Sequence, residues 1–297
     1  LLYDWQKMKK IIILIPVFND WESLKKLIVE INENIKELKK IDIECVVIND
    51  ASTIKQSKLL KPTFIKSIQI LNMRENKGHA RCNAFGIRYV IKNKDFDYLI
   101  LMDGDGEDRP IELKKLINKI LEDPNKSVVA KRIKRSEGLF FRFLYSMHKL
   151  ITLVFTGKKI NFGNYSCLIK EDVRKLSTQA SLWSSYSGSV KKNLEYFNEI
   201  DSERGTRYFG PSKMSFLKLL IHSFSIIAVF KFQVFFRSLI LILIFSFLDL
   251  SFGTNFYLLS ILIVIFNMII LIVSFREKQK DLLNSQENLE GSEEITH

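Results

Sequence analysis

Short apolar runs alternate with segments of helical periodicity over residues 11–130. The runs are almost continuously apolar, which is typical of parallel strands covered on both faces. They predict strands over residues 11–16, 43–49, 67–73, 97–103 and 127–131. Apolar positions three and four apart predict helices over residues 24–38, 78–91 and 110–121. Strand–helix repetition of this kind indicates an open, mainly parallel α/β sheet with right-handed crossovers.

Long apolar runs replace this alternation in the last third of the chain. Residues 139–155 and 212–230 are predicted to form amphipathic helices. Residues 232–248 are apolar apart from Gln233 and Arg237, and residues 250–275 hold no charged side chain over 26 positions. Because a membrane span needs about 20 apolar residues, we predict a two-helix transmembrane hairpin. The alternative is a buried helical pair in a soluble protein.

The charge distribution predicts on which side of the membrane the rest of the chain lies. The chain has a net charge of +12, although its tail, residues 276–297, carries six acidic and three basic residues. A basic body beside the spans favours a cytoplasmic location for that body. We therefore expect a multi-pass protein of the inner (cytoplasmic) membrane. The expected parts are a cytoplasmic domain (8–210), a juxtamembrane amphipathic helix (211–231), two spans (232–275) and a disordered cytoplasmic tail (276–297).

Other features of the composition narrow the class further. Three scattered cysteines, Cys45, Cys82 and Cys167, favour buried thiols in a reducing compartment over a disulfide or zinc framework. No zinc-finger spacing or aromatic-rich RNA motif is present, so we expect no nucleic-acid partner. Met8, followed by two lysines, is a candidate natural start, with Leu1–Lys7 as an upstream extension.

The candidate chemistry lies at the end of the fourth predicted strand, in the stretch DGDGEDRP of residues 103–110. Ligands of open α/β sheets bind beyond the carboxyl ends of strands. Asp103 and Asp105 flank a glycine there, and Mg²⁺ commonly takes one or two carboxylates together with substrate phosphates. Glu107 is a candidate third ligand, and Asp108 is expected to cap the helix that begins at Pro110.

Three other interpretations of this stretch compete with a metal site. A surface Asp-Gly turn is common, and acids also gather at helix N-termini. An EF-hand calcium loop is disfavoured, because Asp108 stands where that loop needs glycine and Lys114 where it needs glutamate.

Five segments occur in this order: IIILIPVFND, VVINDAST, NKGHARCNAFGI, LILMDGDGEDRP and VVAKRIKR. Together they resemble family 2 glycosyltransferases over about residues 10–135. The usual fold of that family is the glycosyltransferase A type, a Rossmann-like mixed sheet. The later segment RYFGPSKMSFLKLLIHSFS (207–225), followed by two apolar runs, is similar to a particular branch. That branch includes dolichol-phosphate mannose synthase and bacterial polyprenyl-phosphate glucosyltransferases.

The resemblance implies roles for individual residues of this sequence. Donor binding is implied for Pro16, Phe18, Asn19, Asp50, Gly78, Arg81 and Asp103. A divalent ion, Mg²⁺ or Mn²⁺, is implied for Asp103, Asp105 and Glu107. Contact with the acceptor phosphate is implied for Arg132, Arg135, Arg207, Ser212 and Lys213. Catalysis is implied for Asp103, Asp105, Arg132 and Arg207. The chain departs from the family at Asn49-Asp50-Ala51, where two acids and a glycine are usual, so the base of the nucleotide is open.

These observations predict a metal-dependent, inverting glycosyltransferase that moves a sugar from a UDP- or GDP-sugar to a polyprenyl phosphate, undecaprenyl or dolichyl. An ionised acceptor phosphate needs no strong general base. Two alternatives stay open. One is transfer to a hydroxyl of a glycolipid or lipid-linked glycan, with Glu171 or Asp172 as the base. The other is a non-catalytic membrane adaptor with this fold. We also consider a homo-oligomer, because a two-helix hairpin buries little surface.

Overall fold

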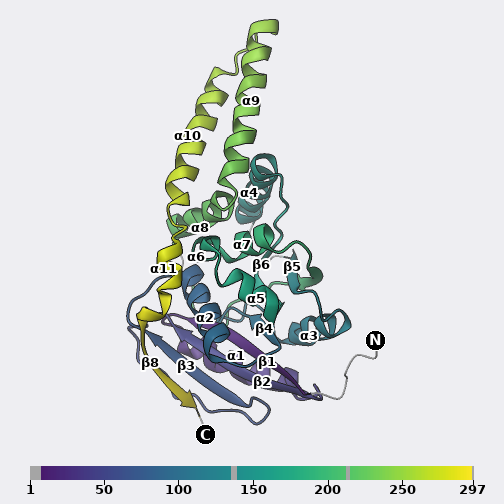
Figure 1. The fold of residues 1–297 in the computed structure, drawn as a ribbon, viewed down its shortest axis with the longest axis vertical. Coiled ribbons are helices and arrows are strands. Elements are labelled where there is room, and N and C mark those ends of the chain that lie inside the picture. The colour runs from purple at the N-terminus through teal and green to yellow at the C-terminus, as the bar shows by residue number, and fades with distance from the viewer. Residues whose placement is uncertain (1–7, 135–138, 212–214, 296–297) are drawn as a thin grey trace.

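An eight-stranded mixed sheet forms the centre of the protein (Figure 1). The computed structural model describes residues 8–134, 139–211 and 215–295. The strand order is β7-β5-β6-β4-β1-β2-β3-β8, and β6 and β8 run against the other strands. The strands are β1 (Lys9–Val17), β2 (Ile41–Asn49), β3 (Ser67–Met73), β4 (Tyr98–Leu101), β5 (Val128–Lys134), β6 (Phe162–Ile169), β7 (Asn198–Glu203) and β8 (Leu289–Ile295).

Helices cover both faces of this sheet. They are α1 (Trp21–Ile35), α2 (His79–Asn93), η1 (Pro110–Glu112), α3 (Leu113–Glu122), α4 (Leu139–Thr156), α5 (Lys170–Leu176), α6 (Ala180–Ser184), α7 (Tyr186–Asn193), α8 (Phe216–Ala228), α9 (Lys231–Phe252), α10 (Tyr257–Ser274), α11 (Gln279–Leu283) and η2 (Ser285–Asn288). Helices α1 and α3 pack on one face, and α2, α5, α6 and α7 pack on the other.

Strand β1 shows why the predicted strands are continuously apolar. Ile11 and Ile13 belong to the core under α1 and α3, whereas Ile12 and Leu14 belong to the core under α2. Both sets are buried, so neither face of the strand can be polar. All five predicted strands are present, and the predicted mixed, mainly parallel sheet is confirmed. The three cysteines are free and buried, as expected.

Helices α9 and α10 extend together away from the sheet domain (Figure 1). By length and composition they are candidate membrane spans, with mean hydropathies of 2.1 and 2.9 in their most apolar stretches. Only 11% and 22% of those stretches are buried, which disfavours the alternative of a buried helical pair. The 22 residues of α9 give a length of about 33 Å, close to the thickness of a bilayer core. Apolar residues of α8, α9 and α10 form a small core at the base of the pair.

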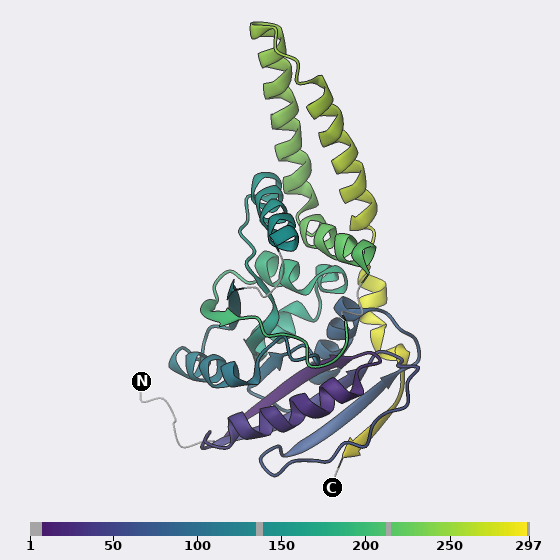
Figure 2. The same ribbon diagram turned by 180° about the vertical axis from the view of Figure 1, so that it is seen from behind.

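The expectation of a disordered tail is wrong for the described residues up to 295. After α10 the chain returns along the sheet domain to its outer edge (Figure 2). There β8 pairs antiparallel with β3. Leu282 is fully buried, and Arg88 donates hydrogen bonds to the carbonyls of Ser177 (2.8 Å) and Leu283 (3.0 Å). The acidic composition of this segment gave no sign of a strand. The strand forms because the open edge of β3 can pair with backbone groups whatever the side chains are. The sheet domain therefore includes the C-terminal strand.

Candidate active site

One edge of the sheet gathers most of the predicted site residues. β1, β2, β3, β4, β5 and β7 run in the same direction and end at this edge, and the reversed strand β6 begins there. The polar residues that these strand ends supply are Asn19, Asp20, Asp50, Asp103, Arg132, Asn164, Arg204 and Arg207. Five residues that the family resemblance implies for the site therefore lie at one edge of the sheet: Asn19, Asp50, Asp103, Arg132 and Arg207.

Asp103 lies directly after β4 in a network of polar side chains. Its Oδ1 is 3.3 Å from Nε2 of His79 and accepts a hydrogen bond from Nδ2 of Asn164 at 3.1 Å. Burial acts to raise the pKa of Asp103, but His79, Arg132 and Asn164 outweigh burial and lower it below its usual range. Burial likewise opposes charge on His79, and the neighbouring carboxylates, led by Asp103, raise the pKa of the imidazole. Asp103 is therefore held as a carboxylate.

Asp105, the second carboxylate, is held by an arginine from the other half of the chain. Arg207 Nη1 donates to Asp105 Oδ2 at 2.6 Å, and its other terminal nitrogen pairs with Asp20. The side chains of all three residues are 15–18% exposed. Burial and the charge of Asp103 raise the pKa of Asp105 to about 6, against the opposing effect of Arg207 and Arg204. Arg207 thus shares its single positive charge between two half-buried carboxylates, Asp20 and Asp105.

Glu107 does not join the two aspartates as a third ligand. The chain turns at Gly106, where φ is 88°, and the Glu107 carboxylate forms an ion pair with Arg204. Among the described residues, no three His, Cys, Asp or Glu side chains could hold a metal ion by themselves. The predicted three-carboxylate set is therefore wrong. Asp103 and Asp105 still fit a hard divalent ion as two buried oxygen donors, provided that substrate phosphates complete the set.

Asp108 is also placed differently from the expectation. Its Oδ2 accepts the backbone N–H of Asp103 at 3.0 Å, and the following helix begins without a side-chain cap. Burial and the charge of Asp103 raise the pKa of Asp108 to about 8. Asp108 thus closes the acidic loop on itself rather than capping the helix.

Gly104 separates the two aspartates for a steric reason. A Cβ at Gly104 would lie 2.9 Å from the carbonyl oxygen of Pro16, at the end of β1. Glycine therefore lets the acidic loop lie directly against the neighbouring strand end. This contact places Pro16 beside the predicted metal ligands.

The predicted donor residues Asp50 and Gly78 are joined in the structure. The two carboxylate oxygens of Asp50 accept the backbone N–H groups of Lys77 (2.8 Å) and Gly78 (2.9 Å). Asp50 is 3% exposed, and burial raises its pKa while these N–H groups oppose that rise. Asp50 therefore fixes the loop before α2, and its direct contact with a nucleotide stays a prediction.

Asn19 fixes the loop that follows β2. Its Oδ1 accepts the N–H groups of Thr53 (2.8 Å) and Ile54 (3.0 Å). Ala51 has φ of 55° in the same loop. This left-handed conformation explains why glycine, which the family usually has here, would be favoured. Phe18, an exposed residue directly after β1, precedes Asn19 in the sequence.

The predicted basic residues do not all reach the carboxylates. The positive charge of Arg132 helps to lower the pKa of Asp103 and opposes the rise in the pKa of Asp108. Its guanidinium lies against Gly163 at the start of β6. Arg81, in contrast, lies over the Trp183 ring at 5.7 Å, where Arg276 and Asp281 are the charges that act on it. The remaining predicted residues, Arg135, Ser212 and Lys213, and the extension Leu1–Lys7 lie outside the described residues.

The two candidate bases of the hydroxyl-acceptor alternative lie at the opposite edge of the sheet. β6 runs antiparallel to β4, so that Ile169 pairs with Tyr98 at the start of β4. Glu171 and Asp172 follow Ile169, and Asp172 accepts a hydrogen bond from Ser127 at 2.5 Å. They are therefore separated from Asp103 by the length of β4.

Four residues of this edge were not among the predicted site residues: Asp20, His79, Asn164 and Arg204. His79 follows the Asn-Lys-Gly segment that the resemblance already pointed to, and that position was the available signal. The other three become partners only when distant segments meet, and no local pattern marks them.

The mixed, mainly parallel sheet and the polar edge at its strand ends place the protein in the class of glycosyltransferases with the A-type fold. The family model described as Glycosyl transferase family 2 matches residues 12–182, more than half of the chain. The chain belongs to that family.

Two relatives show what this chain is similar to in sequence. An undecaprenyl-phosphate 4-deoxy-4-formamido-L-arabinose transferase of Proteus mirabilis is 23% identical over 73% of this chain and 66% of its own length. An uncharacterised protein of Methanocaldococcus jannaschii is 28% identical over 40% of this chain and 49% of its own length. The chain thus spans half to two thirds of the length of these relatives.

A solved structure is similar in fold. It is glucosyl-3-phosphoglycerate synthase from Mycobacterium tuberculosis in complex with Mn²⁺, UDP-glucose and phosphoglyceric acid. The two match with a TM-score of 0.50 and 12% identity, over 76% of this chain and 80% of the other. At this identity the likeness shows the fold alone.

Proposed function

We propose that the protein is a membrane-attached, inverting glycosyltransferase that moves a sugar from a UDP- or GDP-sugar to a polyprenyl phosphate. The observation that carries this proposal is the meeting of Asp103 and Asp105 with Arg132 and Arg207 at one sheet edge. A donor diphosphate and an acceptor phosphate both need cations. This edge supplies arginines, and its two carboxylates could hold a further, divalent cation. The relative from Proteus mirabilis, whose name includes undecaprenyl phosphate, supports the acceptor class.

The residues of this edge have distinct roles in the proposed reaction. Asp103 and Asp105 would hold Mg²⁺ or Mn²⁺, which when bound neutralises charge that develops on the leaving diphosphate. Arg132 and Arg207 would hold the acceptor phosphate close to the donor against their mutual repulsion. The acceptor phosphate has a second pKa of about 6, so it attacks without a general base. In-line attack would invert the configuration at the sugar carbon.

Two structural features support membrane attachment with the sheet domain on one side. The chain enters α9 from α8 at the base of the pair, and after α10 it returns to β3. Both ends of the hairpin therefore face the same side of a membrane. We infer that this side is the cytoplasmic face of the inner membrane, because the body next to the hairpin is basic.

Purified full-length protein should be mixed with labelled UDP- and GDP-sugars, Mg²⁺ or Mn²⁺, and undecaprenyl or dolichyl phosphate. The expected result is lipid-phase label that EDTA abolishes and that is lost in Asp105→Asn. Label that survives EDTA would overturn the metal part of the proposal. Label only with a hydroxyl acceptor would overturn the acceptor, and nucleotide binding without turnover would favour the adaptor.

A further inference from the structure

The helix α9 carries a positive charge inside its apolar length. Arg237 lies six residues after Lys231, which is about 9 Å along the helix axis. Lys231 pairs with Glu277 at 3.2 Å, and Asp249 near the far end accepts the N–H of Phe256 at 2.9 Å. Among the described residues, no carboxylate forms an ion pair with Arg237. A cation at this depth is costly unless it finds an anion or a polar partner.

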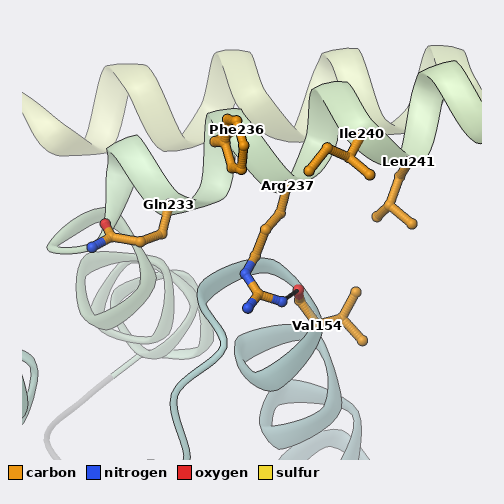
Figure 3. A pocket seen from close by; sticks show the side chains of 6 residues that line it. All are labelled: Val154, Gln233, Phe236, Arg237, Ile240 and Leu241. Carbon is orange, nitrogen blue, oxygen red and sulfur yellow. Dashed lines mark hydrogen bonds between the residues drawn. The ribbon is translucent and has the colours of Figure 1, made fainter.

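The protein gives Arg237 one neutral partner at the end of α4. Arg237 Nη1 donates to the carbonyl oxygen of Val154 at 3.3 Å (Figure 3). A Cβ at Gly157 would lie 2.5 Å from Arg237 Nη2, so the guanidinium lies against the glycine that ends α4. The negative end of the α4 dipole favours this contact. Since a guanidinium has five N–H donors, further donors are available to a ligand.

A cavity of about 570 Å³ opens beside this guanidinium. Its lining is Val154, Gln233, Phe236, Arg237, Ile240 and Leu241. Gln233 and Arg237 are one helical turn apart and leave α9 on the side that faces α4 (Figure 3). The other four lining residues are apolar. The cavity therefore has a polar end with a cation, and hydrocarbon walls.

Three of the apolar lining residues are themselves exposed, and further exposed apolar side chains precede Val154 on α4. On α4, Met147, Leu150 and Val154 are 39–54% exposed, and on α9, Phe236 and Ile240 are 66% and 41% exposed. This surface lies beside the candidate span, where acyl chains would surround α9 in a bilayer. Its place indicates a ligand with hydrocarbon chains and an anionic head.

We propose that this cavity binds a phospholipid of the bilayer, with its phosphate on Arg237 and Gln233 and its acyl chains along Phe236 and Ile240. None of the lining residues belongs to the edge with Asp103 and Asp105, where an acceptor phosphate must react. The occupant is therefore a bilayer lipid that anchors α4 to α9, rather than the substrate. The proposal depends on the membrane attachment but on neither the sugar nor the acceptor.

Native mass spectrometry of the full chain in detergent tests this site with phosphatidylglycerol as the probe. Since a basic side chain near a lipid surface contributes about 1 kcal/mol, Arg237→Gln should lower retained phosphatidylglycerol about fivefold. Lys218→Gln, which removes an exposed cation of α8 outside the cavity, should leave retention unchanged. Ile240→Trp keeps the cation but fills the cavity, and it should also lower retention; this variant decides the question if Arg237→Gln does not fold.

Three results would overturn the proposal. The first is unchanged phosphatidylglycerol retention in Arg237→Gln or, where that variant does not fold, in Ile240→Trp. The second is an equal loss in Lys218→Gln, which would indicate attraction to the whole basic surface. The third is Arg237-dependent retention of undecaprenyl phosphate but not of phosphatidylglycerol, which would assign the cavity to the acceptor. Because no arm requires turnover, an inactive enzyme with a wild-type lipid profile would count against the proposed reaction alone.

Discussion

Arg207→Gln is the substitution that most directly tests the arrangement at the sheet edge. It keeps a polar side chain but removes the cation that Asp105 and Asp20 share. Breaking a buried ion pair from one side leaves a charge without a partner. Asp105 can escape that cost by taking up a proton, so the size of the effect depends on pH.

The pKa of Asp105 sets the magnitude. Burial and Asp103 raise this pKa to about 6 even with Arg207 in place, and without Arg207 it rises further. A folded-state pKa above that of the unfolded chain means that stability falls as pH rises through the folded value. In wild type, the fall in stability that Asp105 causes ends near pH 6. In the variant, where the pKa of Asp105 is higher, this fall in stability continues above pH 6. At pH 7.5 the added cost from Asp105 is at most about 2 kcal/mol, which is about 1.36 kcal/mol for each pH unit above the wild-type pKa, and it reaches that limit when the pKa in the variant lies above the pH of the measurement. At pH 5.5 Asp105 is already mostly protonated, so its part of the added cost is small, and the cost that remains is the loss of the ion pair with Asp20.

Thermal unfolding in detergent at pH 5.5 and 7.5, followed by tryptophan fluorescence, measures this difference. We expect Arg207→Gln to be more destabilising at pH 7.5, and Mn²⁺ with UDP to restore more stability to the variant than to wild type. Asp20→Asn is the matched control, because it removes the other partner of Arg207 and leaves Asp105 paired. Equal destabilisation at both pH values, with no added effect of Mn²⁺, would refute the reasoning.

Three further predictions concern the elements around the site. Gly104→Ala should destabilise the fold by about 1–3 kcal/mol and abolish transfer, because its Cβ would lie 2.9 Å from a carbonyl oxygen. Gly291→Ala is the control: its Cβ would have nothing within 4 Å, so it should be neutral in the same unfolding and transfer assays. Asn19→Ala should lower stability by about 1–2 kcal/mol and raise KM for the donor more than it lowers kcat, which steady-state kinetics would reveal; an unchanged KM would contradict it. Ending the chain at Asn288 removes β8 and opens the edge of β3, so we expect a lower Tm and aggregation by size-exclusion chromatography, and a monodisperse product with the wild-type Tm would contradict this.

The sheet could be predicted from the sequence because its core is unambiguous. Strand β1 buries both faces, so seven consecutive buried residues produce a continuous apolar run. Helix α1 buries one face, and Leu24, Leu27 and Ile28 reveal its period. The short strands β6, β7 and β8 escaped prediction because each combines apolar and polar positions, and the neighbouring strand rather than its own pattern decides its place.

The carboxylates of the site could be predicted, whereas their partners could not. Asp103 and Asp105 follow a recognisable strand end, and that local signal is enough to place them. Arg207 meets Asp105 across a separation of 102 residues, and Arg204 meets Glu107 across 97. Only the parallel arrangement of β4 and β7 brings these segments to one edge. For the same reason Glu107 looked like a third ligand until its partner was known.

The chain after β7 connects the site to the candidate membrane spans and then returns to the sheet. The chain leaves the sheet domain after β7, passes Arg204 and Arg207 at the site, and reaches α9 through α8. It returns from α10 through Arg276, which acts on Arg81 of α2, and ends as β8 on β3. The pair of candidate spans is thus tied to the sheet on both sides in the sequence, through β7 at one edge and β8 at the other. In the proposed membrane-attached arrangement, a single connection would leave the domain free to rotate over the membrane, whereas two connections would restrain the height and orientation of Asp103 and Asp105 relative to the bilayer surface. The proposed transfer from a soluble donor to a lipid-bound acceptor would need such a restraint, because the acceptor phosphate stays at the membrane surface.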